Sequence, residues 1–294
     1  ADIFKFFNKY GIQMHSGYGM TEATGGITMT PTGEYIEDSV GMPLPGIQLK
    51  IEDDGELRIR GHYVSKGYFK EKKSKSFNQG WFYTGDIFEK QNGHFFIIDR
   101  KKDIYKNSRG QTISPQKIEN LFQDFDSIKS VFLVGDGKEF NTLLIYPDNN
   151  NSPIDLSSIN EQKIRDIFSS MILSVNSFLA PFERIINYVI INRDFESKRD
   201  EITPKGTYIR KKILRNFEKI ISPLYEKNYV SLHHNAKEVR FPNWLLREIG
   251  TVKSHLKWNG KVVSIKNQSN NLILSWENNI IHLGNLVYNH DKYI

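Results

Sequence analysis

The stretch DRKKDIYKNSRGQTISPQKIE, residues 99–119, decides how this chain is divided. It follows a strand-like FFII run, passes through three consecutive cations and a glycine-containing loop, and leads into a helix at Ser114-Pro115. Only a few residues at such a boundary need to absorb the change in backbone angles when one domain turns against another. The stretch therefore predicts a hinge followed by a binding loop.

The composition is that of a globular protein. The 294 residues predict two or three structural units, and a hydrophobic content of 38% with a mean hydropathy of −0.49 leaves room for packed cores. No apolar run approaches the roughly 20 residues that a membrane-spanning helix needs, and the opening residues do not read as a signal peptide. The lack of cysteine excludes disulfides and thiolate metal sites and fits a reducing compartment, so we expect a cytoplasmic protein.

Most of the net charge of +6 lies near the C-terminus. Residues 226–294 hold nine Lys or Arg against five Asp or Glu, a surplus of four. We expect a solvated basic surface and no nucleic-acid partner, with peripheral contact to an anionic membrane as the alternative. Three tryptophans and a histidine pair in this region predict a small hydrophobic core and an exposed turn without metal, rather than a surface for single strands; they are Trp244, Trp258, Trp276 and His233-His234.

Changes in sequence texture predict an α+β fold in three parts. Residues 1–101 are rich in short strand-like runs and predict a β-rich subdomain. Residues 102–222 alternate helical and strand-like segments and predict a small α+β domain. Residues 223–294 predict an appended, mostly β module, with one short helix within residues 233–250 and three or four strands within residues 257–289.

Several individual elements can be predicted from local patterns. The chain opens on an amphipathic helix, and a strand is expected at residues 11–15. The triplets at 53–55 and 91–93 end in Gly between alternating runs, which predicts hairpin turns. A last helix of the α+β domain is expected over about residues 208–221.

The segment GYGMTEATGG, residues 17–26, has the parts of a nucleotide site. Tyr18 offers an aromatic face for a purine, Gly19 allows close approach of the backbone, and Thr21 can donate to a phosphate oxygen. Glu22 supplies a carboxylate, and Mg²⁺ usually takes one or two carboxylates together with substrate phosphates. The alternative for the segment alone is a turn and a helix cap.

Two further positions add candidate contacts to a nucleotide. Asp86 follows Gly in WFYTGD, where a carboxylate can accept hydrogen bonds from both vicinal hydroxyls of a ribose; the alternative is an ordinary turn Asp. Arg100 ends the β-rich region, where its forked guanidinium can grip ribose and phosphate together. Lys101 and Lys102 then lie at the boundary, either as a hinge or as a solvated linker.

The motifs GYGMTEA, GELRIRG, WFYTGD and DRKKD…SRGQTISPQKIE follow one another in this order. In that order they closely resemble the adenylate-forming superfamily, in particular its long-chain acyl-CoA synthetases, over residues 1–222. The resemblance implies the C-terminal portion of such an enzyme, with the end of the adenylate-binding domain followed by a hinged lid. It also implies a two-step ligase, in which a fatty acid and Mg·ATP give an acyl-adenylate and pyrophosphate, and coenzyme A then displaces AMP.

The resemblance assigns roles to the nucleotide candidates. Tyr18 would stack on adenine, Thr21 would touch the α-phosphate, and Glu22 would bind Mg²⁺. Asp86 and Arg100 would hold the ribose.

It also assigns roles around the hinge. Lys102 matches the pivot about which the lid turns between an adenylating and a thioester-forming pose. Lys106 and Gly110 would belong to the face that serves the second step, where Gly110 leaves room for the pantetheine arm to pass the backbone. Arg109 stands where the family often has a second Gly.

The sequence departs from the family pattern in two places. The Ser/Thr/Gly-rich loop ending in Lys, which cradles the outer phosphates, does not precede Gly17, so we expect this chain to be part of a longer protein and inactive alone. In EITPKGTYIRKKIL, Thr207 stands where the family has a catalytic lid Lys, and Arg210 fixes that alignment. Lys205, two residues earlier, is the candidate substitute, because losing one such cation typically costs on the order of 3 kcal/mol.

Two alternatives remain for the function. The acyl group would pass to the phosphopantetheine of an acyl carrier protein instead of free coenzyme A. Alternatively, Thr207 marks a catalytically silent relative that binds AMP or an acyl-adenylate as a sensor or scaffold.

Overall fold

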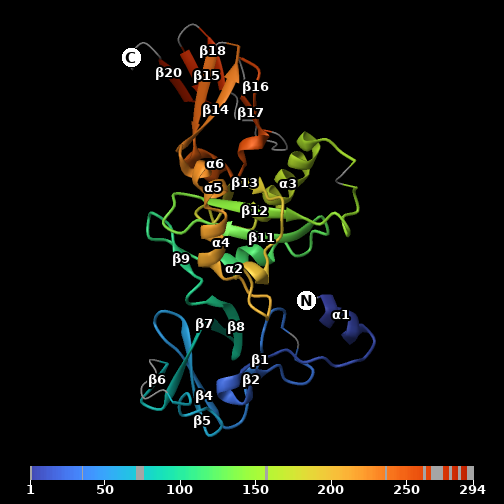
Figure 1. Cartoon of the computed structure of the whole chain (residues 1–294), viewed down its shortest axis with the longest axis vertical. Helices are drawn as coiled ribbons and strands as arrows, with labels where there is room; N and C mark the ends of the chain where they lie inside the picture. Colours follow the sequence, from blue (N-terminus) through green and yellow to red (C-terminus); the bar gives the residue numbers. More distant parts are fainter. Residues whose placement is uncertain are drawn as a thin grey trace. The chain divides into compact units, whose positions relative to one another are not determined.

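The computed structural model describes residues 2–34, 36–70, 76–155, 158–235, 237–260, 263–265, 274–277, 280–283 and 286–289. The chain divides into two compact units, Ala1–Ile104 and Tyr105–Ile294 (Figure 1). The division falls inside the stretch 99–119 that predicted a hinge.

Unit 1 opens on the helix α1 and then consists almost entirely of antiparallel strands. Three strands form one sheet in the order β1-β2-β3, and five form a second sheet in the order β4-β5-β7-β6 with β8 on β7. The core between these elements contains Ile27, Leu57, Ile59, Phe88 and Phe95. The elements are α1 Asp2–Lys9, β1 Gly17–Met20, the 3-10 helix η1 Thr21–Ala23, β2 Gly25–Met29, β3 Met42–Pro43, β4 Ile47–Ile51, β5 Glu56–Gly61, β6 Phe77–Asn78, β7 Trp81–Gln91 and β8 His94–Arg100.

Both predicted hairpin turns of unit 1 are confirmed. Gly55, with φ of +84°, lies in the turn between β4 and β5. Asn92 and Gly93 both have positive φ and join β7 to β8 in a two-residue turn, as a type I′ turn requires. The strand expected at residues 11–15 was wrong: Gly11 has φ of +74° and ends the helical turn, and the first strand begins only at Gly17.

Unit 2 is built on a three-stranded sheet that is covered on both faces. β11 (Ile128–Val134) pairs antiparallel with β12 (Asn141–Pro147), and β12 pairs parallel with β13 (Ile185–Ile190) after the crossover helix α3 (Glu161–Asn176). Because side chains alternate along a strand, Leu143 of β12 packs with α3 and Leu144 packs on the opposite face. That opposite face is covered by α4 (Arg210–Asn216) and α5 (Glu218–Ile221). The short elements β9 Tyr105–Lys106, β10 Thr112–Ile113 and α2 Pro115–Asn120 precede the sheet.

We call residues 105–221 the sheet domain. The last helix predicted for this domain differs from the observed structure in its bounds. A single helix was expected over about residues 208–221, but the structure has α4 and α5, with Phe217 between them at φ −103° and ψ +10°. Tyr208 lies before α4 and forms a bridge with Ile202. Phe217 is buried against Phe195, so packing at the break decides where the first helix ends.

Residues after α5 continue in unit 2 and share its core. Phe140 and Ile186 of the sheet domain pack with Val230, Leu246 and Leu256 of the following residues in one cluster. The described elements are η3 Ser222–Tyr225, β14 Tyr229–His234, β15 Lys237–Pro242, α6 Asn243–Ile249, η4 Lys253–His255, β16 Leu256–Trp258, β17 Val263–Ile265, β18 Leu274–Glu277, β19 Ile280–Leu283 and β20 Leu286–Asn289.

Three predictions for this C-terminal region need correction. His233 and His234 end the strand β14, where they pair with Glu238 and Lys237, so they do not form a turn. Trp244 is 48% exposed and lies outside the core, whereas Trp258 packs against the core. The side chain of Trp276 lies outside the described residues. The described part of residues 256–289 contains five strands instead of three or four.

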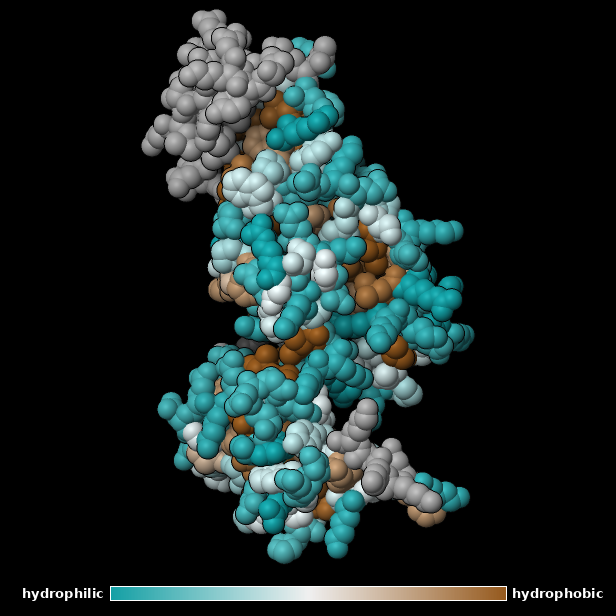
Figure 2. All heavy atoms as spheres, turned by 90° about the vertical axis from the view of Figure 1, so that its left-hand side faces the viewer, coloured by the Kyte–Doolittle hydropathy of each residue, from teal (hydrophilic) through white to brown (hydrophobic). Residues whose placement is uncertain are grey.

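The surface in Figure 2 is mostly hydrophilic, with hydrophobic side chains showing in small patches. Among the described residues, no helix combines the length and apolar character needed to cross a membrane.

Candidate functional site

Tyr18, on β1, and Asp86, on β7, meet inside unit 1. The Tyr18 hydroxyl donates a hydrogen bond of 2.6 Å to Asp86 Oδ2, and its ring packs edge-on against Phe88 at 4.9 Å between centroids. Gly19 lies opposite Gly26 on β2, and a Cβ at Gly19 would stand 2.3 Å from the carbonyl oxygen of Gly25. Glycine at position 19 therefore allows the tight β1–β2 approach that presents Tyr18.

The sequence places Asp86 after Gly85 and predicts that it stands at the start of a strand, but the structure puts it within β7, five residues after Trp81. Its backbone N–H donates to Thr84 Oγ1 at 3.2 Å, and that hydroxyl donates to the Leu57 carbonyl at 2.7 Å. Asp86 pairs across the ladder with Arg100, the last residue of β8, and Arg100 Nε lies 3.8 Å from Asp86 Oδ1. Tyr18, Asp86 and Arg100 thus form one cluster, which we call the Asp86 cluster.

The partly buried carboxylate of Asp86 gains free energy when it accepts hydrogen bonds. Burial raises the pKa of Asp86, opposed by the Tyr18 hydroxyl and by the nearby charges of Arg100 and Lys102. Burial also raises the pKa of Tyr18, helped by the adjacent Asp86, so the Tyr18 hydroxyl keeps its proton and remains a donor. The side chain of Asp86 is only 17% exposed, and hydroxyl groups that donate to it would replace water it has lost.

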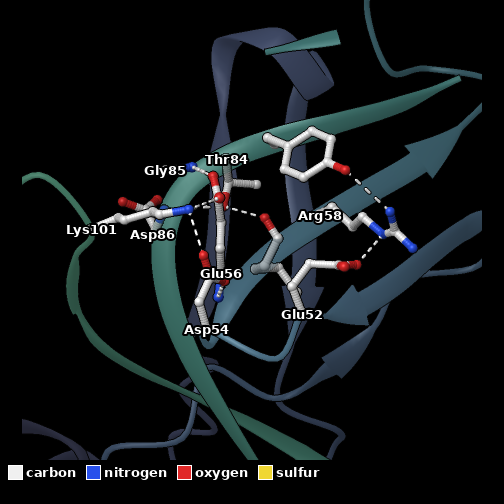
Figure 3. A network of polar contacts seen from close by, with 10 residues as sticks. Glu52, Asp54, Glu56, Arg58, Thr84, Gly85, Asp86 and Lys101 are labelled. Carbon is white, nitrogen blue, oxygen red and sulfur yellow. Dashed lines mark hydrogen bonds and ion pairs between the residues drawn. The ribbon is translucent and has the colours of Figure 1, made fainter. Parts of the chain in front are cut away.

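A second network, which the sequence did not predict, holds Gly85, the residue before Asp86 (Figure 3). Lys101 Nζ lies 2.6 Å from Asp54 Oδ2 and 2.7 Å from Glu56 Oε2, and Glu56 Oε1 accepts from the Gly85 N–H at 3.0 Å. Hydrogen bonds from Lys101 to Asp54 and Glu56 raise the pKa of the lysine. Lys101 is therefore anchored to unit 1, although the sequence placed it in a hinge or solvated linker.

Lys102 differs from its neighbour in this respect. It is exposed in the turn that follows β8. In this turn the N–H groups of Asp103 and Ile104 donate hydrogen bonds to the Arg100 carbonyl at 2.9 and 3.1 Å. Unit 1 ends at Ile104, two residues later. Lys101 is thus held by two carboxylates of unit 1, whereas Lys102 is exposed in the turn.

Thr21 and Glu22 lie in η1, which follows Met20 at the end of β1. Their contacts lead to a different loop from the Asp86 cluster: Glu22 Oε1 accepts from the Tyr68 hydroxyl at 2.8 Å, and the Glu22 carbonyl accepts from Ser65 N at 2.7 Å. Within the described ranges no group of three His, Cys, Asp or Glu residues is placed to hold a metal ion. Glu22 alone offers the single carboxylate that a phosphate-bound Mg²⁺ needs.

Lys106 ends β9, where it pairs with Thr112 of β10, and Gly110 lies in the loop between these two strands. Asn107 closes this loop, since its Oδ1 accepts from the N–H groups of Arg109 and Gln111, each at 3.0 Å. Gly110 has φ of +79°, and a Cβ there would meet no atom within 4 Å. In this structure the backbone angle is the reason for glycine, while room for a pantetheine arm stays a prediction.

The loop with Lys205 and Thr207 is closed by hydrogen bonds at both ends. Thr203 N donates to the Thr207 carbonyl at 2.9 Å, and Thr207 N donates to Thr203 Oγ1 at 3.1 Å. Lys205 is exposed at the turn, and Gly206 follows it with φ of +80°. Thr207 is thus held by its backbone, whereas Lys205 is free to extend.

Arg210, three residues on, has a different role. Its guanidinium pairs with Glu119 of α2 in a nearly buried ion pair and lies 4.8 Å from the centre of the Phe132 ring. Glu119 also accepts from the Leu133 N–H at 2.7 Å. This pair fixes the start of α4 to the sheet.

Two family models match the chain. The model described as AMP-binding enzyme matches residues 1–69, and the model described as AMP-binding enzyme C-terminal domain matches residues 102–229. The long-chain-fatty-acid–CoA ligase FadD15 of Mycobacterium bovis is 29% identical over 243 residues, covering 77% of this chain and 40% of the relative. The human long-chain-fatty-acid–CoA ligase 6 is 31% identical over 243 residues, covering 73% and 35%. The chain thus spans less than half the length of these curated relatives.

Solved structures with the same fold are adenylate-forming proteins. The adenylation domain of the carboxylate reductase from Mycobacterium chelonae superposes with a TM-score of 0.61 at 19% identity, over 76% of this chain and 36% of the other. The O-succinylbenzoate coenzyme A synthetase of Bacillus subtilis, in complex with its acyl-adenylate intermediate, gives 0.58 at 19% identity, over 72% and 43%. At these identities the likeness shows the fold.

Proposed function

Because this chain belongs to the adenylate-forming superfamily, we propose that it forms the nucleotide-holding and lid-bearing part of a long-chain acyl-CoA synthetase. The whole protein would join a fatty acid to coenzyme A at the expense of ATP. The observation that supports this proposal most strongly is the Asp86 cluster, in which Tyr18 and Arg100, from two other strands, converge on the partly buried carboxylate of Asp86.

The hydrogen-bonding groups of the Asp86 cluster fit a ribose. The carboxylate would accept hydrogen bonds from the two vicinal hydroxyls, while Tyr18 keeps it oriented by donating to Oδ2. Arg100, with its guanidinium 3.8 Å from Oδ1, would meet the ribose from the other side. Tyr18 would act as a positioning residue through its hydroxyl and would offer its ring to adenine.

Thr21 and Glu22 follow Tyr18 in the chain and would meet the phosphates of the same nucleotide. Thr21 would donate to the α-phosphate. Glu22 fits Mg²⁺ because its Oε1 is oriented by the Tyr68 hydroxyl and its second oxygen can coordinate a phosphate-bound ion. Mg²⁺ would neutralise phosphate charge while a carboxylate oxygen of the fatty acid attacks the α-phosphorus and pyrophosphate leaves.

The second step would use the lid in another pose. The thiol of coenzyme A would lose its proton and attack the acyl carbon, and AMP would leave as the acyl–phosphate bond breaks. Lys102 would be the pivot, because the cation before it is fixed by Asp54 and Glu56. Lys106 and Gly110 would lie on the coenzyme side.

Turnover by the whole protein tests the proposal. We expect ATP-dependent formation of a long-chain acyl-CoA, and we expect the Asp86→Asn variant to lose at least tenfold in kcat/KM for ATP. The matched control is Asp53→Asn, since Asp53 is exposed in the β4–β5 turn and carries the same charge. Equal kcat/KM for the two variants would reject the role of Asp86.

The acceptor is tested in the same assay. Free coenzyme A and an acyl carrier protein bearing phosphopantetheine are offered in turn with the acyl-adenylate formed in place. Transfer to coenzyme A supports the synthetase, and transfer to the carrier protein alone would replace it with a carrier-loading ligase.

Thr207 supports a second candidate, a catalytically silent sensor that binds AMP or an acyl-adenylate. Its backbone is closed onto Thr203, so its hydroxyl would replace the lid cation of the family with a neutral group. Pyrophosphate exchange decides: binding of AMP without any exchange favours the sensor, and robust exchange eliminates it. If exchange occurs, a normal rate in Lys205→Ala would exclude Lys205 as the substitute cation.

A further inference from the structure

Unit 2 contains a cleft of about 450 Å³ that is separate from every residue assigned above. One wall comes from α3 and β13 of the sheet domain, and the other comes from the residues after α5, including the start of β14 and of α6 (Figure 1). The volume lies in the range of small-molecule sites, about 300–1,000 Å³.

The floor of this cleft is apolar and belongs to a packed core. Phe140, Ile186 and Val230 line it, and each of these side chains is at least nine-tenths buried in the cluster shared by the sheet domain and the C-terminal residues. These side chains already lie out of water, so an apolar group that entered the cleft would gain by removing its own apolar surface from water against them.

Polar groups at one side of the cleft are held in place by one another. Ser254 Oγ lies 2.6 Å from Ser169 Oγ, and the Tyr188 hydroxyl donates to the Arg165 carbonyl at 2.7 Å. Asn187 Oδ1 accepts from the Tyr188 N–H at 3.0 Å, and within the described part of the chain its amide nitrogen has no hydrogen-bond partner, so it can donate to a ligand.

The charges at the rim are mainly positive. Arg165, Lys227 and Lys253 line the cleft together with one carboxylate, Glu226. Arg165 is paired with Glu161 at 2.6 Å, so the two lysines supply the excess. Among the residues that the structure describes, neither Lys227 nor Lys253 lies within ion-pair distance of a carboxylate, and Lys227 Nζ lies 5.8 Å from the centre of the Tyr229 ring.

We propose that this cleft binds a small organic anion, with a carboxylate or phosphate head against Lys227, Lys253 and Asn187 and an apolar body on the floor of Phe140, Ile186 and Val230. Charge-assisted hydrogen bonds from two ammonium groups and an amide would hold the head. Because one wall belongs to the sheet domain and the other to the C-terminal residues, the ligand would bridge the two.

Calorimetric titration of the 294-residue chain tests the site independently of any ligase activity. The probes are decanoate and decyl phosphate, each below its micellar concentration, with decanol and inorganic phosphate as the matched half-ligands. We expect saturable one-to-one binding of at least one of the two anions, and the stronger of them identifies the head group. Binding of each half-ligand should be at least tenfold weaker. Equal binding of decanol and decanoate, or no binding of either anion, would overturn the proposal.

Variants place the binding in the cleft. The double variant Lys227→Glu/Lys253→Glu should weaken the anion at least tenfold, whereas Lys219→Glu/Lys257→Glu makes the same change of charge at exposed lysines outside the lining and should leave the affinity unchanged. Asn187→Leu removes a proposed hydrogen-bond donor without a change of charge and should also weaken binding of the anion. Equal affinities in all three variants would contradict the assignment.

Discussion

Asp86 is costly to the fold because its charge is largely removed from water. Burial raises its pKa above the unfolded value, so the native state binds more protons than the unfolded chain between those two pKa values. The free energy of unfolding therefore falls as the pH rises through that window. A residue kept at such a cost fits a binding role better than a structural one.

Replacing this carboxylate with an amide removes the cost of burying a charge. Asp86→Asn should raise the melting temperature of unit 1 by about 4–8 °C at neutral pH, which corresponds to about 1 kcal/mol for a domain of about 100 residues. The difference should shrink towards about pH 3, where Asp86 is protonated in both states. Thermal melts across this pH range measure it, and an unchanged or lower melting temperature at neutral pH would contradict the account of Asp86.

Thr207 is the residue where the lid departs from its family. Thr207→Lys in the whole protein should raise pyrophosphate exchange by roughly 10²–10³, the effect of one preorganised cation at a developing charge. Thr207→Leu is the control, since it adds bulk without charge. An equal rate in both variants would show that position 207 does not face the reacting phosphate.

The candidate residues were predictable one by one, but the contact between Tyr18 and Asp86 was not. Each side chain carries its chemistry in the sequence, whereas their hydrogen bond joins positions 68 residues apart. For Gly110 the structure adds a second reason for glycine, its positive φ, while the predicted passage of a pantetheine arm stays a prediction.

At the scale of elements, one β-bulge determines which residue faces Asp86. The Asn92-Gly93 turn pairs Gln91 with His94, and an unbroken ladder from that pair would set Asp86 opposite Asp99. A shift between Ile87 and Phe88 moves Arg100 there instead. The turn follows from local sequence, whereas the position of the bulge between Ile87 and Phe88 is not marked by any local pattern.

The loop that carries Lys205 and Thr207 is anchored at its start by Glu201. Burial opposes the charge of this fully buried carboxylate, but hydrogen bonds from Arg193, Asn216 and the Glu196 N–H outweigh it and lower the pKa of Glu201 to about 2. The stabilisation is present above the unfolded pKa and is lost as the pH falls towards 2.

Glu201→Gln should destabilise unit 2 by about 1–3 kcal/mol at neutral pH, because it leaves Arg193 without its charged partner. The loss should become smaller between about pH 4 and pH 2. Chemical denaturation at several pH values measures it, with Glu196→Gln as the control on a more exposed carboxylate. A difference between variant and parent that does not change with pH would show that Glu201 is not ionised in the folded protein.

On the scale of the whole molecule, the C-terminal residues behave as part of unit 2. Arg184 donates to the carbonyls of Arg247 and Glu248 at the end of α6, and Asn176 donates to the Gly250 carbonyl. Val252 packs within the core of the sheet domain. The change in sequence texture predicted an appended module, but these long-range contacts are not visible in local patterns.

Truncation after Glu226 should therefore damage the domain that it leaves behind. Phe140 and Ile186 would be exposed, at about 1.5–3 kcal/mol for each side chain. Losses of this size should lower the melting temperature by about 10 °C or more. The reference for this measurement is a chain that ends after Asn289. An unchanged melting temperature would show that the C-terminal residues fold separately.

The binding of AMP tests the central claim most directly. The dissociation constant of AMP is measured by equilibrium dialysis with the whole protein and its Asp86→Asn and Asp53→Asn variants. The account predicts that Asp86→Asn raises the dissociation constant of AMP at least tenfold, corresponding to about 1.4 kcal/mol. Asp53→Asn should leave the dissociation constant unchanged. The same dissociation constant in all three proteins would contradict the assignment of the Asp86 cluster to the ribose.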